Sequence, residues 1–182
     1  SDLSFATGNN PYQISAPVNG FLYVANQGAG TVSVINATTG VLSNTINVED
    51  EPYGLATVTV SDVTYVYVAN TGSDSVSVIN TATNTVVATI DVGVKPYYVA
   101  AVGTDVYVTN GQSNTVSVID ATSRTVTDTI SVGSYPRGIK AHGTDLYVAN
   151  YGDLNYSGGN TVTVIDSATN TVTDTIILPG TA

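Results

Sequence analysis

Residues 67–90 read Tyr-Val-Ala-Asn-Thr-Gly-Ser-Asp-Ser-Val-Ser-Val-Ile-Asn-Thr-Ala-Thr-Asn-Thr-Val-Val-Ala-Thr-Ile, and this stretch decides the fold. It contains three short phrases in which β-branched or aromatic residues alternate with small ones. Alternation with a period of two residues is the pattern of a strand with one buried face. Gly, Ser, Asp and Asn separate the phrases, and these residues form turns. The stretch therefore predicts three consecutive short strands.

The same phrases recur along the chain in the same order, so the chain is built from repeats. The first phrase, Tyr-Val-Ala/Thr-Asn, occupies Tyr23–Asn26, Tyr67–Asn70, Tyr107–Asn110 and Tyr147–Asn150. The second phrase, Val-Ser/Thr-Val-Ile-Asn/Asp, occupies Val32–Asn36, Val76–Asn80, Val116–Asp120 and Val162–Asp166. The third phrase occupies Val41–Ile46, Thr85–Ile90, Thr125–Ile130 and Thr171–Ile176. A proline and a short apolar stretch precede each copy, at Pro11, Pro52, Pro96 and Pro136.

Four strands in each of four repeats is the pattern of propeller blades. One small sheet cannot bury both of its faces, whereas blades stacked around an axis bury each other. The sequence therefore predicts an all-β fold, a four-bladed β-propeller of four-stranded antiparallel blades, within residues 11–182. The blades are expected at about 11–51, 52–95, 96–135 and 136–180.

Over residues 11–180 these phrases resemble the YVTN β-propeller repeat family, which is found in surface-layer and other secreted proteins of archaea and bacteria. The resemblance implies an extracellular or cell-surface location. It also implies that the segment after each proline is the innermost strand, as at Tyr53–Val58, and that the third phrase is the outermost. Many members have seven blades, whereas this chain shows four repeats.

Residues 1–10 do not fit four complete blades, and they predict an extra N-terminal strand. Aligning Pro11 with Pro136 sets Gly8 against Gly133, at the end of an outermost strand. The fourth repeat already has its own outer strand, so the chain is a piece of a larger propeller, or this strand closes the ring, or it pairs with another subunit. The alternative is a frayed N-terminal segment in which apolar and polar residues alternate by chance. The residues that would carry the assembly strand are Leu3, Phe5 and Thr7.

Composition narrows the classes of partner. Acidic residues outnumber basic ones 14 to 4, which argues against nucleic acid and against anionic membrane surfaces. No apolar run approaches the roughly 18 residues that span a membrane, so membrane insertion is not expected. Without cysteine there are no disulfides. Because the chain does not start with Met, we expect a processed leader or an excised fragment.

The sequence offers no constellation for catalysis, and we expect no enzyme. The single histidine, His142, cannot form a histidine-rich metal site. We expect it to be a structural or channel-lining residue. Lys95, Arg137 and Lys140 form a local positive spot in an acidic chain, where pairing with neighbouring Asp is favoured over anion binding.

Calcium is the one cofactor that the sequence suggests. The fourth repeat has an insertion after Asn150 that contains Asp153 and Asn155, whose oxygens suit Ca²⁺. Insertions in repeat proteins map to loops, often on the binding face. A second acidic cluster lies on the same predicted face, at Glu49, Asp50 and Glu51. Neither has the spacing of a known calcium loop, and the alternative is a solvated loop.

Tyrosines and glycosylation sequons give the remaining candidates. Tyr23, Tyr67, Tyr107 and Tyr147 share one repeat position and are expected to pack between blades. Other tyrosines cluster near the loops before each inner strand and are candidates for a partner surface: Tyr53, Tyr97, Tyr98, Tyr135 and Tyr151. Sequons at Asn36 and Asn155 are glycosylation candidates in an exported protein.

Two functions follow from these observations. The first is an extracellular structural protein, a subunit of a surface layer or filament that assembles with itself through β-strand addition. The alternative is a secreted binding module that takes a glycan or a protein on its tyrosine-rich loop face. The surplus strand and the polar, weakly charged composition favour the first.

Overall fold

The computed structural model describes residues 7–152 and 160–179, and in them it shows four antiparallel sheets of four strands each. The first sheet holds β1 (Pro11–Ile14), β2 (Phe21–Asn26), β3 (Thr31–Asn36) and β4 (Leu42–Asn47), with a 3₁₀ turn at Gln27–Ala29. The second holds β5 (Pro52–Val60), β6 (Val63–Asn70), β7 (Ser75–Asn80) and β8 (Thr85–Asp91). The third holds β9 (Pro96–Val102), β10 (Asp105–Asn110), β11 (Thr115–Asp120) and β12 (Thr125–Ser131). The fourth holds β13 (Pro136–His142), β14 (Asp145–Asn150), β15 (Thr161–Asp166) and β16 (Thr171–Ile177).

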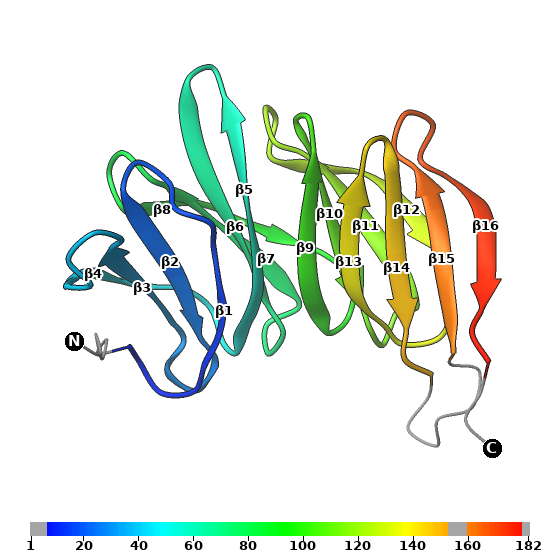
Figure 1. Cartoon of the computed structure of the whole chain (residues 1–182), viewed down its shortest axis with the longest axis horizontal. Coiled ribbons are helices and arrows are strands. Elements are labelled where there is room, and N and C mark those ends of the chain that lie inside the picture. The colour runs from blue at the N-terminus through cyan, green and yellow to red at the C-terminus, as the bar shows by residue number, and fades with distance from the viewer. Residues whose placement is uncertain (1–6, 153–159, 180–182) are drawn as a thin grey trace.

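The predicted fold class, a four-bladed propeller, is confirmed (Figure 1). In every blade the strands pair in chain order, from the segment that follows the proline to the third phrase. Register places the core residues of adjacent strands opposite one another, as with Tyr67, which faces Val78. Val78 in turn faces Ala88 on the outer strand.

Each blade has two apolar faces that meet different neighbours. We call the face that carries the tyrosine of the first phrase the tyrosine face, and the opposite face the counter face. In the first blade the tyrosine face comprises Tyr23, Ala25, Val32, Val34 and Ile46, all buried. It packs on the counter face of the second blade, formed by Leu55, Val66, Val68 and Ile79. The same pairing joins the second blade to the third and the third to the fourth. At about 1.5–3 kcal/mol for each fully buried aliphatic side chain, these contacts supply most of the driving force for stacking.

The four blades form an arc. The inner strands contact one another in series, β1 with β5, β5 with β9, and β9 with β13, with no comparable contact from β13 back to β1. The first and fourth blades accordingly lie at opposite ends of the molecule in Figure 1. A cavity of about 890 Å³ opens between the inner strands and is lined by residues of all four blades.

One loop geometry recurs at the same end of every blade. The residue before each proline has a positive φ, 52° at Asn10, 53° at Glu51, 56° at Lys95 and 52° at Tyr135. Its carbonyl accepts a hydrogen bond from the backbone N–H of the residue that follows the first phrase, as Glu51 does from Thr71. The start of every inner strand is thereby fixed to the end of the second strand of the same blade. The side chains that follow the prolines therefore point to the same side of the molecule.

Candidate functional site

The side chains that immediately follow the four prolines converge on the loop face at which the inner strands begin. They are Tyr12, Tyr53, Tyr97 and Arg137. The ring centroids of Tyr12 and Tyr53 lie 3.6 Å apart, and those of Tyr53 and Tyr97 lie 5.2 Å apart with nearly perpendicular planes. The Tyr53 hydroxyl donates a hydrogen bond to the Tyr12 hydroxyl. One repeat position therefore builds a continuous aromatic cluster across three blades.

Arg137 extends this cluster into the fourth blade through contacts with aromatic faces. Its guanidinium carbon lies 4.7 Å from the centroid of Tyr97, 5.0 Å from that of Tyr151 and 5.5 Å from that of Tyr135. Such cation–π contacts contribute roughly 0.5–1 kcal/mol each at exposed sites. Together with Tyr98, which packs edge-on against Tyr53, these residues form what we call the tyrosine cluster.

Burial changes the acidity of this cluster. Burial, and then the hydrogen bond shared with the Tyr135 hydroxyl at 2.9 Å, raise the pKa of Tyr97 to about 12. Burial and the bond to Tyr12 raise the pKa of Tyr53 as well. The Tyr53 and Tyr97 hydroxyls are therefore neutral at ordinary pH and serve as hydrogen-bonding groups rather than as bases.

The structure brings the five tyrosines proposed as a partner surface into one cluster, while Tyr53 and Tyr97 are themselves buried. The accessible members are Tyr12 and Tyr151, at 47% and 50% exposure. Sequence reasoning missed Tyr12, and it treated Arg137 as part of a positive spot rather than as a member of the tyrosine cluster. The signal that could have found them is the repeat alignment itself, because both occupy the position after the proline.

The acidic run lies beside the tyrosine cluster but does not gather into a metal site. Glu51 pairs with Lys95 at 3.7 Å, and the Asp50 backbone N–H donates to the Ser73 hydroxyl. Both acids line a polar cavity of about 670 Å³ together with Asn10 and several glycines. In residues 7–152 and 160–179, no three acidic or histidine side chains are close enough to hold a metal ion.

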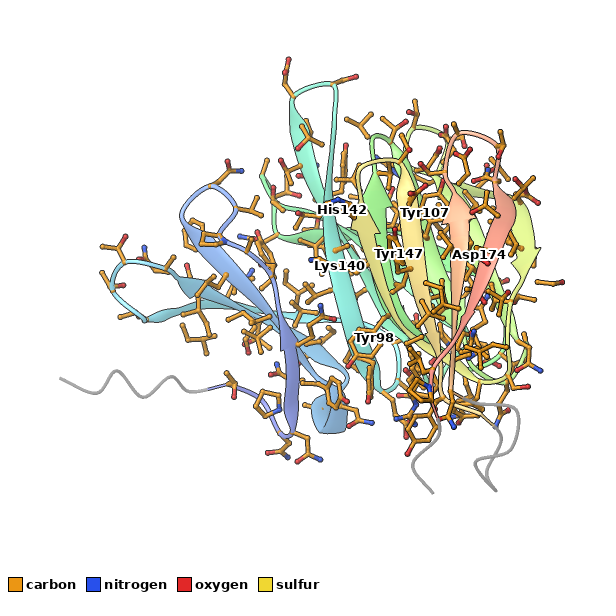
Figure 2. All side chains as sticks on the ribbon, turned by 45° about the vertical axis from the view of Figure 1, so that its right-hand side comes forward. Tyr98, Tyr107, Lys140, His142, Tyr147 and Asp174 are labelled. Atoms are coloured by element: carbon orange, nitrogen blue, oxygen red, sulfur yellow. The ribbon has the colours of Figure 1, made fainter. Side chains whose placement is uncertain are left out.

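The remaining candidates from the sequence are the calcium ligands of the insertion, the glycosylation sequons and the basic residues. Asp153 and Asn155 lie outside the described residues, so calcium binding stays a prediction, as does glycosylation at Asn155. Asn36 is the last residue of β3, and its side-chain oxygen accepts hydrogen bonds from the N–H groups of Thr38 and Thr39 in the turn that follows. Lys140 lines the central cavity, and His142 is exposed at the end of β13 (Figure 2). Lys95 pairs with Glu51 and Arg137 stacks on Tyr97, so the three cations proposed as one positive spot have different surroundings.

Of the predicted assembly strand, only Thr7 is described, whereas Leu3 and Phe5 lie outside the described residues. Gly8 nevertheless sits against the side chain of Asn26, as Gly133 sits against that of Asn150. Gly133 follows the outer strand of the blade that precedes Asn150. Gly8 therefore takes the position that would follow an outer strand preceding the first blade.

The tyrosine face of the fourth blade differs from the other three. Tyr23, Tyr67 and Tyr107 are fully buried between blades as expected, but Tyr147 is partly exposed and its neighbour Ala149 is exposed (Figure 2). Ile176 is 40% exposed, whereas its three repeat equivalents, Ile46, Ile90 and Ile130, are 6–7% exposed. A surface of the kind that is interior elsewhere in the molecule is uncovered here.

Comparison with known proteins supports the fold. No protein-family model and no curated protein matches the chain. Among solved structures, it is similar to hydrazine synthase of Kuenenia stuttgartiensis, with a TM-score of 0.82 and 25% identity over 96% of this chain and 51% of that one. It is also similar to the dihydro-heme d1 dehydrogenase NirN, with a TM-score of 0.76 and 10% identity over 96% of this chain and 39% of that one.

A third similar structure is the WD40 β-propeller domain of Doa1, with a TM-score of 0.72 and 15% identity over 92% of this chain and 53% of that one. The chain thus spans about half the length of the hydrazine synthase and Doa1 chains that it matches. Within the described residues, no helix is long and apolar enough to cross a membrane. The four sheets, their stacked faces and these likenesses together show a chain with the β-propeller fold.

Proposed function

We propose that this chain is an extracellular structural protein, a subunit of a surface layer or filament that assembles with itself. The observation that carries the proposal is the uncovered tyrosine face of the fourth blade. Tyr147, Val162 and Ile176 occupy positions that are buried in every other blade. An exposed apolar surface of this kind favours association, because covering it removes apolar area from water.

The outer strands supply a second means of contact. Every residue of β16 is exposed, and its outer edge has no neighbouring strand in the described part of the chain. Exposed edges present unpaired N–H and C=O groups to a strand from another subunit. The resemblance to YVTN repeats, which are common in secreted proteins, supports a location outside the cell.

The proposal is tested on native material. We expect negative-stain images of extracts from the producing cells to show regular polymers that survive dilution, and antibodies to label intact cells. Deleting residues 1–8 should abolish the polymers while leaving the circular dichroism spectrum of the strands unchanged. Unaltered polymers would eliminate the N-terminal strand as the connector, and material that is never polymeric would eliminate the structural role.

A second candidate function is favoured by the tyrosine cluster. Exposed Tyr151 lies against Arg137, and exposed Tyr12 packs on Tyr53 in the same cluster. Accessible aromatic rings beside an arginine are suited to a glycan or to a protein partner. Tyr12→Ala and Tyr151→Ala should each weaken binding in a glycan array or pull-down by about tenfold or more. Tyr65→Ala is the control, because Tyr65 contacts Arg124 away from the cluster. Equal binding by all three variants would rule this surface out.

A further inference from the structure

We propose that the tyrosine face of the fourth blade docks on the counter face of the first blade of a second copy, so that two chains close one ring of eight blades. This inference goes beyond the proposed structural function, because it names one partner for the uncovered face and has a test of its own. It follows from an interface that the chain already builds three times.

The template is the set of contacts between consecutive blades. At each junction the tyrosine face contributes its tyrosine, two valines and an isoleucine, and the counter face contributes the same four positions. The fifth tyrosine-face position holds alanine in the first two blades and the buried Thr109 in the third. In the fourth blade the tyrosine-face positions hold Tyr147, Ala149, Val162, Val164 and Ile176. Apart from alanine for threonine at one position, they repeat the residues that the third blade buries against the fourth. The tyrosine face of the fourth blade thus has the composition of a face that packs on another blade, but no following blade packs on it in the described residues.

The complementary half of that junction is present on the first blade. Its counter-face positions hold Ile14, Leu22, Val24 and Ile35. Ile14 is 53% exposed, whereas its equivalents Leu55, Val99 and Ile139 are 3–9% exposed. Leu22 is half-buried, and Val24 and Ile35 are already covered. The inner part of this face is therefore open to a second copy.

A polar contact would set the register of the docked pair. The Tyr23 hydroxyl donates to the Asn84 side chain at 2.8 Å, and the Tyr67 hydroxyl to the Ala121 carbonyl at 3.4 Å. Both acceptors lie in the turn between the third and fourth strands of the next blade. In the described residues the Tyr147 hydroxyl donates no such bond. The Ala37 carbonyl of the first blade holds the position of Ala121 in the repeat, and it would accept this bond from the second copy.

A further observation favours closure with a second copy. Consecutive inner strands contact one another, whereas β13 and β1 make no comparable contact, so the four described blades leave the ring open. A twofold pair buries both open faces at once and leaves no blade face uncovered.

The test is the mass of the purified chain by light scattering after size exclusion and by analytical ultracentrifugation. We expect a dimer with twice the mass of the chain. Ile176→Glu places a charge in the proposed junction and should weaken the dimer by about a hundredfold or more, because burying an unpaired carboxylate is costly. Ile14→Glu, which places a charge on the counter face of the first blade, should weaken the dimer to a similar extent.

Val172→Glu is the matched control. Val172 lies on the same strand and is 42% exposed, against 40% for Ile176, but it pairs with Ile165 and so lies on the opposite face. This variant should remain dimeric. Circular dichroism of all three variants should match the parent, since each site is exposed in the single chain.

The outcomes separate the two proposals. A monomeric parent chain, or a dimer that Ile176→Glu and Ile14→Glu leave intact, would overturn the ring. Long open polymers would also overturn it, while supporting the structural function. A closed dimer, together with cells whose surface shows no regular array of this protein, would uphold the ring and remove the surface-layer or filament role.

Discussion

At the scale of the residue, the asparagine that ends each first phrase joins the second strand of its blade to the third through side-chain hydrogen bonds. Asn70 is fully buried, and its side-chain amide donates to the Ser75 hydroxyl at 3.0 Å and to the Ser77 hydroxyl at 2.9 Å. Asn26, Asn110 and Asn150 make the same pair of bonds to hydroxyls on their third strands. The phrase therefore needs a planar side chain with two donors at this point.

Replacing Asn70 with alanine should lower the free energy of unfolding by about 2–4 kcal/mol, because two buried hydroxyls lose their donor and a cavity opens. The measurement is urea denaturation followed by circular dichroism. Asn44→Ala is the control, since Asn44 is exposed and its side chain bonds only the N–H of the next residue. Similar losses in the two variants would contradict this role for Asn70.

The buried tyrosines between blades predict an alkaline limit to stability. Burial, the first cause, raises the pKa of Tyr67 from 10.0 to about 12. Above pH 10 the unfolded chain loses this proton while the folded chain keeps it, so the stabilisation present below pH 10 is lost as pH rises towards 12. Melting temperature should therefore fall over this range, and less steeply in Tyr67→Phe. An identical slope in that variant would contradict the assignment.

At the scale of the element, the close approach of inner strands depends on a missing side chain. A β-carbon built on Gly54 of β5 would lie within 2.4 Å of the Tyr97 carbonyl oxygen on β9. The equivalent residue in the fourth blade, Gly138, has only the Ala149 side chain near it, at 3.9 Å. A side chain is therefore excluded at this repeat position in the second blade, whereas the fourth blade has room for one.

Gly54→Ala should destabilise the protein by about 1–3 kcal/mol, because β5 and β9 must move apart. Gly138→Ala should change stability by less than about 0.5 kcal/mol in the monomer. Thermal melts at low protein concentration measure both. Equal effects would show that the packing of β5 on β9 is looser than the contact with Tyr97 indicates.

At the scale of the whole molecule, the strands and their order were predictable, but the open arc was not. Phrases rich in β-branched and aromatic residues, such as Tyr67–Asn70, predict the strands, but their alternation does not report a single buried face, because all four residues of this phrase are buried between two blades. The angle between blades comes from side-chain packing across each junction, and no spacing in the sequence encodes it. Tyr147 illustrates the limit, since it has the local sequence of Tyr23 and Tyr67 but not their burial.

The candidate site was partly predictable for the same reason. Tyr53 and Tyr97 stand out by residue type, whereas Arg137 joins them only through its place after a proline in the fourth repeat. Its position above three rings depends on how the third and fourth blades stack. Repeat alignment therefore identifies which residues share a place in the blade, and only the assembled blades show which of them meet.

The arc also predicts how stability is distributed along the chain. In stacked repeats each unit is stabilised mainly by its neighbours, so the second and third blades, covered on both faces, should open least often. The fourth blade, with β16 exposed along its whole length, should exchange its amide hydrogens faster. Hydrogen exchange followed by mass spectrometry should show protection falling from β6 and β10 to β15 and β16.

If a second copy covers the fourth blade, this gradient must depend on protein concentration. Raising the concentration should slow exchange in β15 and β16 by about tenfold or more, because mass action populates the dimer, and should leave β6 and β10 unchanged. Ile176→Glu should remove the concentration dependence, and Val172→Glu should retain it. Exchange in β15 that stays fast and independent of concentration in the parent chain would mean that nothing in solution covers the face of Tyr147.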